Sequence, residues 1–111
     1  MNPHIDRLCD EGGFIDRPTF DPWNCSVWIT IEIGFEAGSG ADRFHLQVAT
    51  KQYLKSCNKP QWGKSMLIVE RFGWDEIEKS VGDLLSGIST DNWEDAAKTL
   101  SRYMDWEFDG M

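Results

Sequence analysis

From residue 27 to residue 35 every second side chain is apolar, at Val27, Ile29, Ile31, Ile33 and Phe35. In an extended chain successive side chains point to opposite faces, so this period of two predicts a β-strand with one face on a core. The same period returns over residues 44–48, after a segment containing Gly and Ser. We therefore expect a second strand there and a hairpin between the two.

The rest of the chain alternates short turns with further regular elements. Thr50 can cap a short helical turn, and residues 66–72 predict a third strand that is more buried than the first two. Two helices are expected next, one beginning at Asp75 and one at Asp91, which stands in capping-box spacing before Glu94. Their apolar stripes are Ile77, Val81, Leu84, Leu85 and Ile88 in the first, and Trp93, Ala97, Leu100 and Met104 in the second. Trp106 and Phe108 suit a short closing strand.

The element order β-β-(α)-β-α-α-β indicates an α+β domain over residues 25–111. We expect a mainly antiparallel sheet of about four strands, with two main helices packed on one face. Residues 1–24 hold three of the four prolines and no sustained period, which predicts an irregular N-terminal arm. With 41% hydrophobic and 13% aromatic residues, the chain has the composition of a folded domain rather than a disordered one.

The net charge of −8 lies almost entirely in residues 70–111, which hold eleven Asp or Glu against four Lys or Arg. Such a field attracts a basic partner and repels nucleic acid. For each acid taken singly, a solvated helix face or a favourable place near a helix N-terminus is the simpler explanation. For the excess of negative charge over residues 70–111 as a whole, a basic partner is the better explanation. The candidate binding residues are Glu76, Asp83 and Asp95, which project away from the apolar stripes, and Glu78, Asp91 and Glu94 nearer the flanks.

Trp28 stands on the polar face of the first predicted strand, and Trp62 lies in a loop with Lys and Pro. An exposed Trp can anchor a protein interface. Alternatively, the N-terminal arm or a helix covers Trp28. The sequence favours neither reading.

The residue patterns argue against an enzyme. Asp105 and Glu107 could approach each other on one strand face, but no second kind of catalytic group is near them in sequence, so solvated charges are the better interpretation. His45 could serve as a base for a Cys, yet nothing in the sequence brings one to it. No glycine pattern suits a phosphate loop, and no cofactor is expected.

The cysteines also lack the pattern of a metal site. Cys9, Cys25 and Cys57 are widely spaced without a CxxC pair, so free thiols are expected rather than a metal site. No apolar run reaches the length of a signal peptide or a membrane span, which favours a cytoplasmic protein that does not enter a membrane.

Several short segments carry a resemblance to a known family. They are residues 44–50 (Phe-His-Leu-Gln-Val-Ala-Thr), Tyr53-Leu54, residues 67–72 (Leu-Ile-Val-Glu-Arg-Phe), Trp93 and residues 102–108 (Arg-Tyr-Met-Asp-Trp-Glu-Phe). Together they resemble the immunity protein 8 family of bacteria over about residues 25–109. Lys51-Gln52 departs from the Pro and acidic residue expected after Thr50. Members are small single-domain proteins encoded beside polymorphic or contact-dependent toxins, and are taken to neutralise them.

The resemblance implies stoichiometric binding to a cognate toxin, whose basic surface would meet the acidic helix faces and one exposed Trp. The alternative from the residues alone is an acidic interaction or assembly module without a toxin, such as an adaptor or a self-associating protein. A homodimer is compatible with the sequence but is not predicted. An enzyme dependent on Glu107 ranks third.

Overall fold

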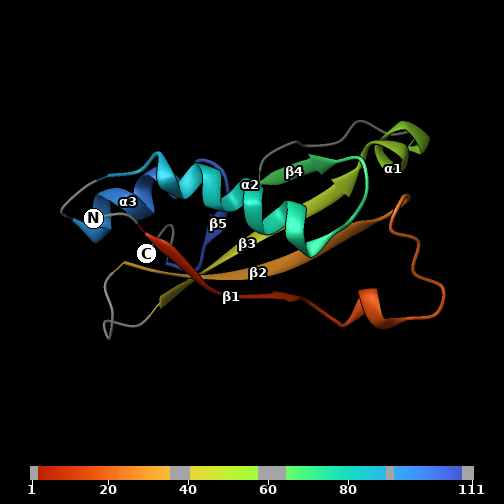
Figure 1. The fold of residues 1–111 in the computed structure, drawn as a ribbon, viewed down its shortest axis with the longest axis horizontal. Helices are drawn as coiled ribbons and strands as arrows, with labels where there is room; N and C mark the ends of the chain where they lie inside the picture. The colour runs from red at the N-terminus through yellow and green to blue at the C-terminus, as the bar shows by residue number, and fades with distance from the viewer. Residues whose placement is uncertain (1–2, 36–40, 58–64, 90–91, 109–111) are drawn as a thin grey trace.

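The computed structural model describes residues 3–35, 41–57, 65–89 and 92–108 (Figure 1). One turn of 3-10 helix, Phe14–Asp16, lies between the first two strands. The strands and helices in chain order are β1 (His4–Asp10), β2 (Ser26–Gly34), β3 (Ala41–Thr50), α1 (Lys51–Ser56), β4 (Met66–Val69), α2 (Trp74–Ser86), α3 (Trp93–Leu100) and β5 (Asp105–Trp106).

All five strands form one sheet, in the order β1-β2-β3-β4, with β5 also paired to β3. The predicted hairpin is confirmed, since β2 and β3 pair antiparallel from Ser26↔Ala49 to Gly34↔Ala41. β4 runs parallel to the C-terminal part of β3, and β5 pairs antiparallel with residues 44–45. Since β2 occupies one side of β3, β4 and β5 share the other. The mainly antiparallel α+β fold is confirmed, with five strands rather than about four.

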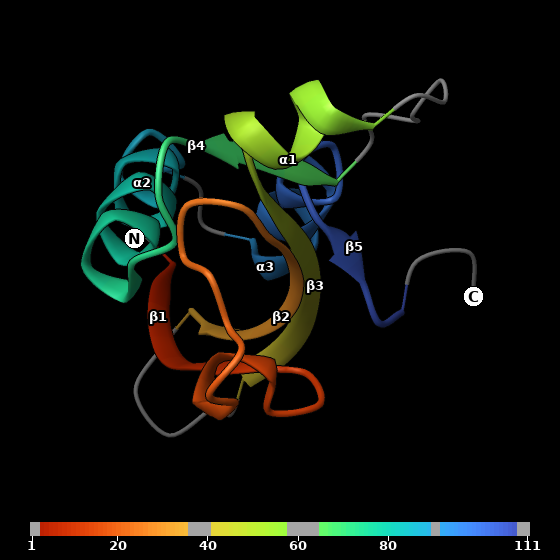
Figure 2. The same ribbon diagram turned by 90° about the vertical axis from the view of Figure 1, so that its right-hand side faces the viewer.

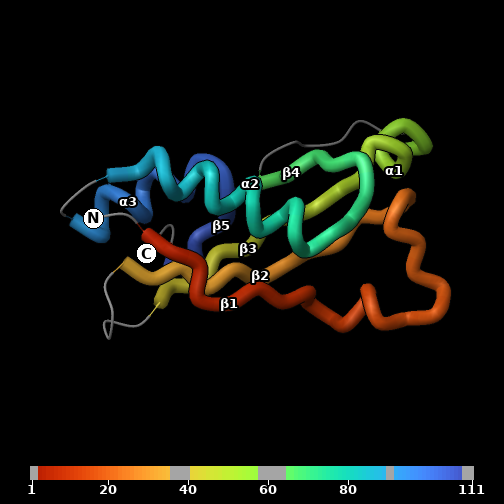
Figure 3. Tube along the Cα trace, in the orientation of Figure 1, coloured from red at the N-terminus to blue at the C-terminus, as the bar shows by residue number. Residues whose placement is uncertain are grey.

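The prediction of an irregular arm over residues 1–24 is wrong for residues 4–10, which form β1 and pair antiparallel with β2. A β-bulge between Ile5 and Arg7 explains why the sequence pattern did not predict this strand, because an extra residue in the strand breaks the period of two. Ile5 and Leu8 both pack against the core although they are three positions apart. After β1 the chain runs past the end of the sheet before it returns to β2 (Figure 3).

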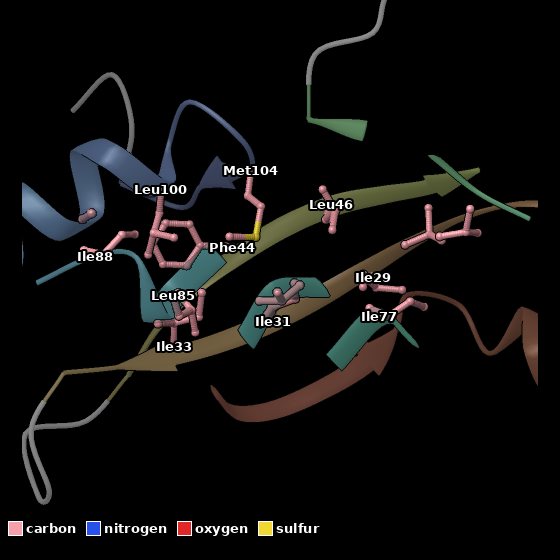
Figure 4. Close-up of a cluster of buried hydrophobic side chains, with 14 of the residues drawn as sticks. Ile29, Ile31, Ile33, Phe44, Leu46, Ile77, Leu85, Ile88, Leu100 and Met104 are labelled. Carbon is pink, nitrogen blue, oxygen red and sulfur yellow. The ribbon is translucent and has the colours of Figure 1, made fainter. Parts of the chain in front are cut away.

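The core lies between the sheet and the two longer helices. Figure 4 shows Ile29, Ile31 and Ile33 of β2 and Phe44 of β3 gathered with helix side chains such as Leu85. The predicted helical stripes are largely confirmed, since every member is buried except two that are half-buried at the margin, Leu84 and Trp93.

The expectation that the third strand is more buried than the first two is wrong. Val69 is buried, but Ile68 is 53% exposed, whereas Ile29 and Ile31 of β2 are 0% exposed. β4 stands at an end of the strand order, and among the described residues β3 alone pairs with it. A short apolar run does not by itself distinguish an edge strand from a central one.

Thr50 caps α1 as predicted and is fully buried. Its Oγ1 accepts a hydrogen bond from Tyr53 N at 3.2 Å and a second from Cys25 N at 3.1 Å. One hydroxyl therefore serves both the helix N-terminus and the chain entering β2.

Replacing Thr50 by Val, which has nearly the same shape, leaves both amide donors without an acceptor. We expect the free energy of unfolding to fall by about 1–3 kcal/mol, measured by urea titration. Thr50→Ser, which keeps the hydroxyl, serves as the control and should lie closer to the wild type. Equal loss in the two variants would show that the hydroxyl contributes nothing.

Candidate functional site

The first part of the acidic surface is the outward side of α2. This helix begins at Trp74, one residue before the predicted start, and Asp75 and Glu76 lie in its first turn, where negative charge favours the helix dipole. Glu76 and Asp83 are both exposed. Lys79, also exposed, lies three residues from Glu76 and four from Asp83, which places it on the same side of the helix. The outward side of α2 is therefore acidic with one basic residue within it.

α3 begins differently from the prediction. The N-cap is Asn92, whose side chain accepts a hydrogen bond from Glu94 N at 2.8 Å, so the capping role assigned to Asp91 is wrong. Asp91 itself lies outside the described residues. Asp95 is exposed on the outward side of α3. Lys98 Nζ lies 3.6 Å from Oε1 of Glu94, which stands four residues earlier on the same helix.

The two helices cover the same face of the sheet at different places. α2 lies along the β1 side, and α3 lies closer to β5 (Figures 1 and 2). Glu78 turns toward β1, where it lines a groove with His4 and Ile5. Glu76 and Asp83 thus share one helix side, Asp95 belongs to the neighbouring helix, and Glu78 faces a different direction.

Trp28 lies on the other face of the sheet. Its neighbours in β2, Val27 and Ile29, point into the core beneath the helices, so Trp28 points away from them. Trp28 is 39% exposed, and Glu11 N, just after β1, donates a hydrogen bond to its backbone oxygen at 2.8 Å. Trp28 and the acidic helix residues therefore do not form one continuous surface.

The face of the sheet that carries Trp28 also holds a polar cluster that the sequence did not predict. Thr30 Oγ1 donates to Glu11 Oε1 at 2.7 Å, and the same carboxylate oxygen bonds His45 Nδ1. Thr30 and His45 stand directly opposite each other on β2 and β3. His45 thus has a carboxylate partner instead of a cysteine. The alternation placed Thr30 and His45 on the polar face, but no sequence signal pointed to Glu11, 34 positions from His45.

The carboxylates considered for acid/base chemistry have structural partners. Asp105 Oδ1 accepts a hydrogen bond from Ser65 Oγ at 2.6 Å. Glu107 Oε1 accepts one from Arg43 N at 2.8 Å, while Glu107 N donates to Arg43 O at 3.0 Å. Both residues therefore hold the C-terminal segment against its neighbours in the fold.

Cys9, Cys25 and Cys57 are free thiols, as predicted. Burial, and to a smaller extent the carboxylate of Asp21, raise the pKa of the Cys25 thiol. Across residues 3–35, 41–57, 65–89 and 92–108, no three His, Cys, Asp or Glu side chains gather as metal ligands would. Within the same ranges, no helix has the length and apolarity needed to cross a bilayer.

The family model described as Immunity protein 8 matches residues 10–110, which includes every segment quoted for the resemblance and extends toward β1. No curated protein and no solved structure matches the chain.

Proposed function

Because the chain belongs to the immunity protein 8 family, we propose that it binds one cognate bacterial toxin and neutralises it by forming a stoichiometric complex. The family match over residues 10–110 is the observation that carries this proposal. The inhibitor would act in the cytoplasm, by covering the toxin's active site or a surface that the toxin needs, without catalysis or a cofactor.

The charge distribution supports a toxin with a basic surface. A chain of net charge −8 gains fast, salt-sensitive association with a basic partner. We assign the first encounter to the acidic helix surface, defined as Glu76 and Asp83 of α2 with Asp95 of α3, all three exposed. We do not assign Trp28 to this surface, because a toxin bound to the helices would not reach the opposite face of the sheet.

The direct test is co-expression with the toxin domain encoded beside this gene. Cells producing the toxin domain alone should stop growing, and cells that also produce this chain should grow. A second test is to mix the two purified proteins and look for a complex of fixed stoichiometry. An unrelated neighbouring gene, together with no protection, would instead favour the acidic assembly module.

Changing Glu76, Asp83 and Asp95 to Lys together should slow association with the toxin domain by about 10–100-fold at low salt. The reason is that three attractive charges become repulsive while the buried stripes stay intact. Stopped-flow measurements at about 0.05 M and about 0.5 M NaCl would separate long-range attraction from contact, because salt screens the former.

The control for this variant is Asp6→Lys with Asp16→Lys, two exposed acids outside α2 and α3. Per charge reversed, it should slow association less than the helix variant does. The acidic helix surface is the wrong assignment if the triple variant binds as fast as the wild type, or if wild-type affinity is nearly the same at both salt concentrations.

A further inference from the structure

One edge of the sheet presents unpaired backbone groups. β4 pairs with β3 on one side only, and no strand of the described residues lies on its other side. Gln47 N donates to Ser65 O at 2.9 Å, so the backbone carbonyl of Ser65 points toward β3. Since alternate residues of a strand direct their backbone groups to the same side, Ser65 and Leu67 face β3. The N–H and C=O groups of Met66 and Ile68 therefore point to the free edge, and no described residue bonds them there.

The opposite edge of the sheet is protected in ways that β4 is not. β1 carries a bulge between Ile5 and Arg7 and the exposed charges of Asp6 and Arg7, two devices that prevent pairing with another chain. β4 reads Met-Leu-Ile-Val, with no charge, proline or bulge. Ile68 is 53% exposed on it. The edge at β4 therefore lacks the bulge and the charges that protect the edge at β1.

An apolar groove lies beside this edge, between β4, α2 and the turn after α3. Its volume is about 220 Å³. Leu67 and Leu84 line it, and Tyr103, which is 52% exposed, stands at its margin. Side chains of an added strand alternate between two faces, so every second one would point to the helix side of the sheet, where the groove lies.

We propose that the toxin supplies an extended segment that pairs with β4 as an additional strand and places an apolar side chain in this groove. The inference rests on the proposed immunity function. Main-chain hydrogen bonds to Met66 and Ile68 would supply affinity, and the groove would select the side chain. A second copy of the chain is the less suitable occupant, because each copy carries a net charge of −8 and copies repel. A basic toxin segment meets no such repulsion.

The test variant is Ile68→Pro. Proline removes the N–H that points to the free edge and leaves the bonds to β3 in place, and it is tolerated on edge strands for this reason. Ile68→Thr is the matched control, because it alters the side chain but keeps the N–H. We expect the proline variant to bind the purified toxin domain encoded beside this gene at least about tenfold more weakly than the threonine variant.

Hydrogen exchange of the wild-type protein gives a readout that does not depend on either variant folding. The Met66 and Ile68 amides should exchange freely in the unbound protein and become protected in the toxin complex. If the wild type binds the toxin but these amides stay unprotected and the two variants bind alike, the added strand is refuted while the immunity function stands.

Two further outcomes distinguish the remaining cases. If the wild type neither binds nor protects against the toxin domain, the proposed function itself fails, whatever the variants do. If light scattering shows a wild-type dimer that Ile68→Pro converts to a monomer with unchanged toxin binding, the edge belongs to a second copy and the proposal is overturned.

Discussion

Replacing Phe44 by Ala should lower the free energy of unfolding by about 3–5 kcal/mol, the range for truncating a buried Phe. Phe44 is 0% exposed. Its ring stacks on Trp106 with centroids 6.3 Å apart and meets Trp93 edge-on at 6.4 Å. The side chain therefore joins β3 to both α3 and β5. Truncation would leave a cavity and also remove two aromatic contacts, each worth about 0.5–1.5 kcal/mol beyond burial.

Phe108→Ala is the matched control for Phe44→Ala. Phe108 also contacts Trp106 edge-on, at 5.9 Å, but it is 46% exposed. Its truncation should cost less than about 1 kcal/mol, because most of the cavity would be open to water. Urea titration of both variants measures the difference. If the two losses agree within error, Phe44 does not hold the core together as the structure indicates.

The local periodicities of the sequence predicted most of the fold. β2 alternates from Val27 onward and β3 alternates from Phe44 to Val48, so the buried positions within these segments could be predicted directly. The helical stripes of α2 and α3 were equally clear for residues such as Ile77, Val81 and Leu100. The spacing of apolar residues describes a single strand or helix, however, and does not show which elements lie beside it in the fold. The parallel pairing of β4 with β3 and its place at the edge depend on strand order, so the burial of Ile68 was predicted wrongly.

β1 was missed for a different reason. Its bulge shifts the apolar side chains out of period, and Ile5 and Leu8 reach the core from positions that no strand pattern connects. Glu11 follows this unpredicted strand, so its bond to His45 could not be predicted from the sequence either. Contacts between residues tens of positions apart can be predicted only once the order and pairing of the strands are known.

The sequence pattern also predicted part of the candidate binding site. The outward positions of Glu76, Asp83 and Asp95 follow from helical geometry, and all three are exposed in the structure. Trp28, which the sequence placed on the polar face of the first strand without deciding whether a helix covers it, lies on the opposite face of the sheet from these three residues.

Asp42→Ala should lower the free energy of unfolding by about 2–4 kcal/mol, because two part-buried donors would lose their acceptor together. Asp42 Oδ2 accepts hydrogen bonds from Trp93 Nε1 at 2.9 Å and from Trp106 Nε1 at 3.0 Å. The indoles come from positions 51 and 64 residues further along the chain, so one oxygen ties the start of α3 and the strand β5 to β3. Asp42→Asn keeps an oxygen acceptor and is the control, with an expected loss of about 1 kcal/mol. Urea titration followed by tryptophan fluorescence measures both, and equal losses would refute the shared acceptor.

The same pair of Asp42 variants also separates the two proposed toxin contacts. Loosening Trp93 disturbs α3, which carries Asp95, whereas β4 pairs with the far end of β3, at residues 47–50. If the acidic helix surface makes the encounter, Asp42→Ala should slow association with the toxin domain more than Asp42→Asn does, under conditions where both remain folded. Protection of the Met66 and Ile68 amides in the complex should be the same in both. Lost protection in the alanine variant alone would instead show that α3 and the β4 edge act as one surface.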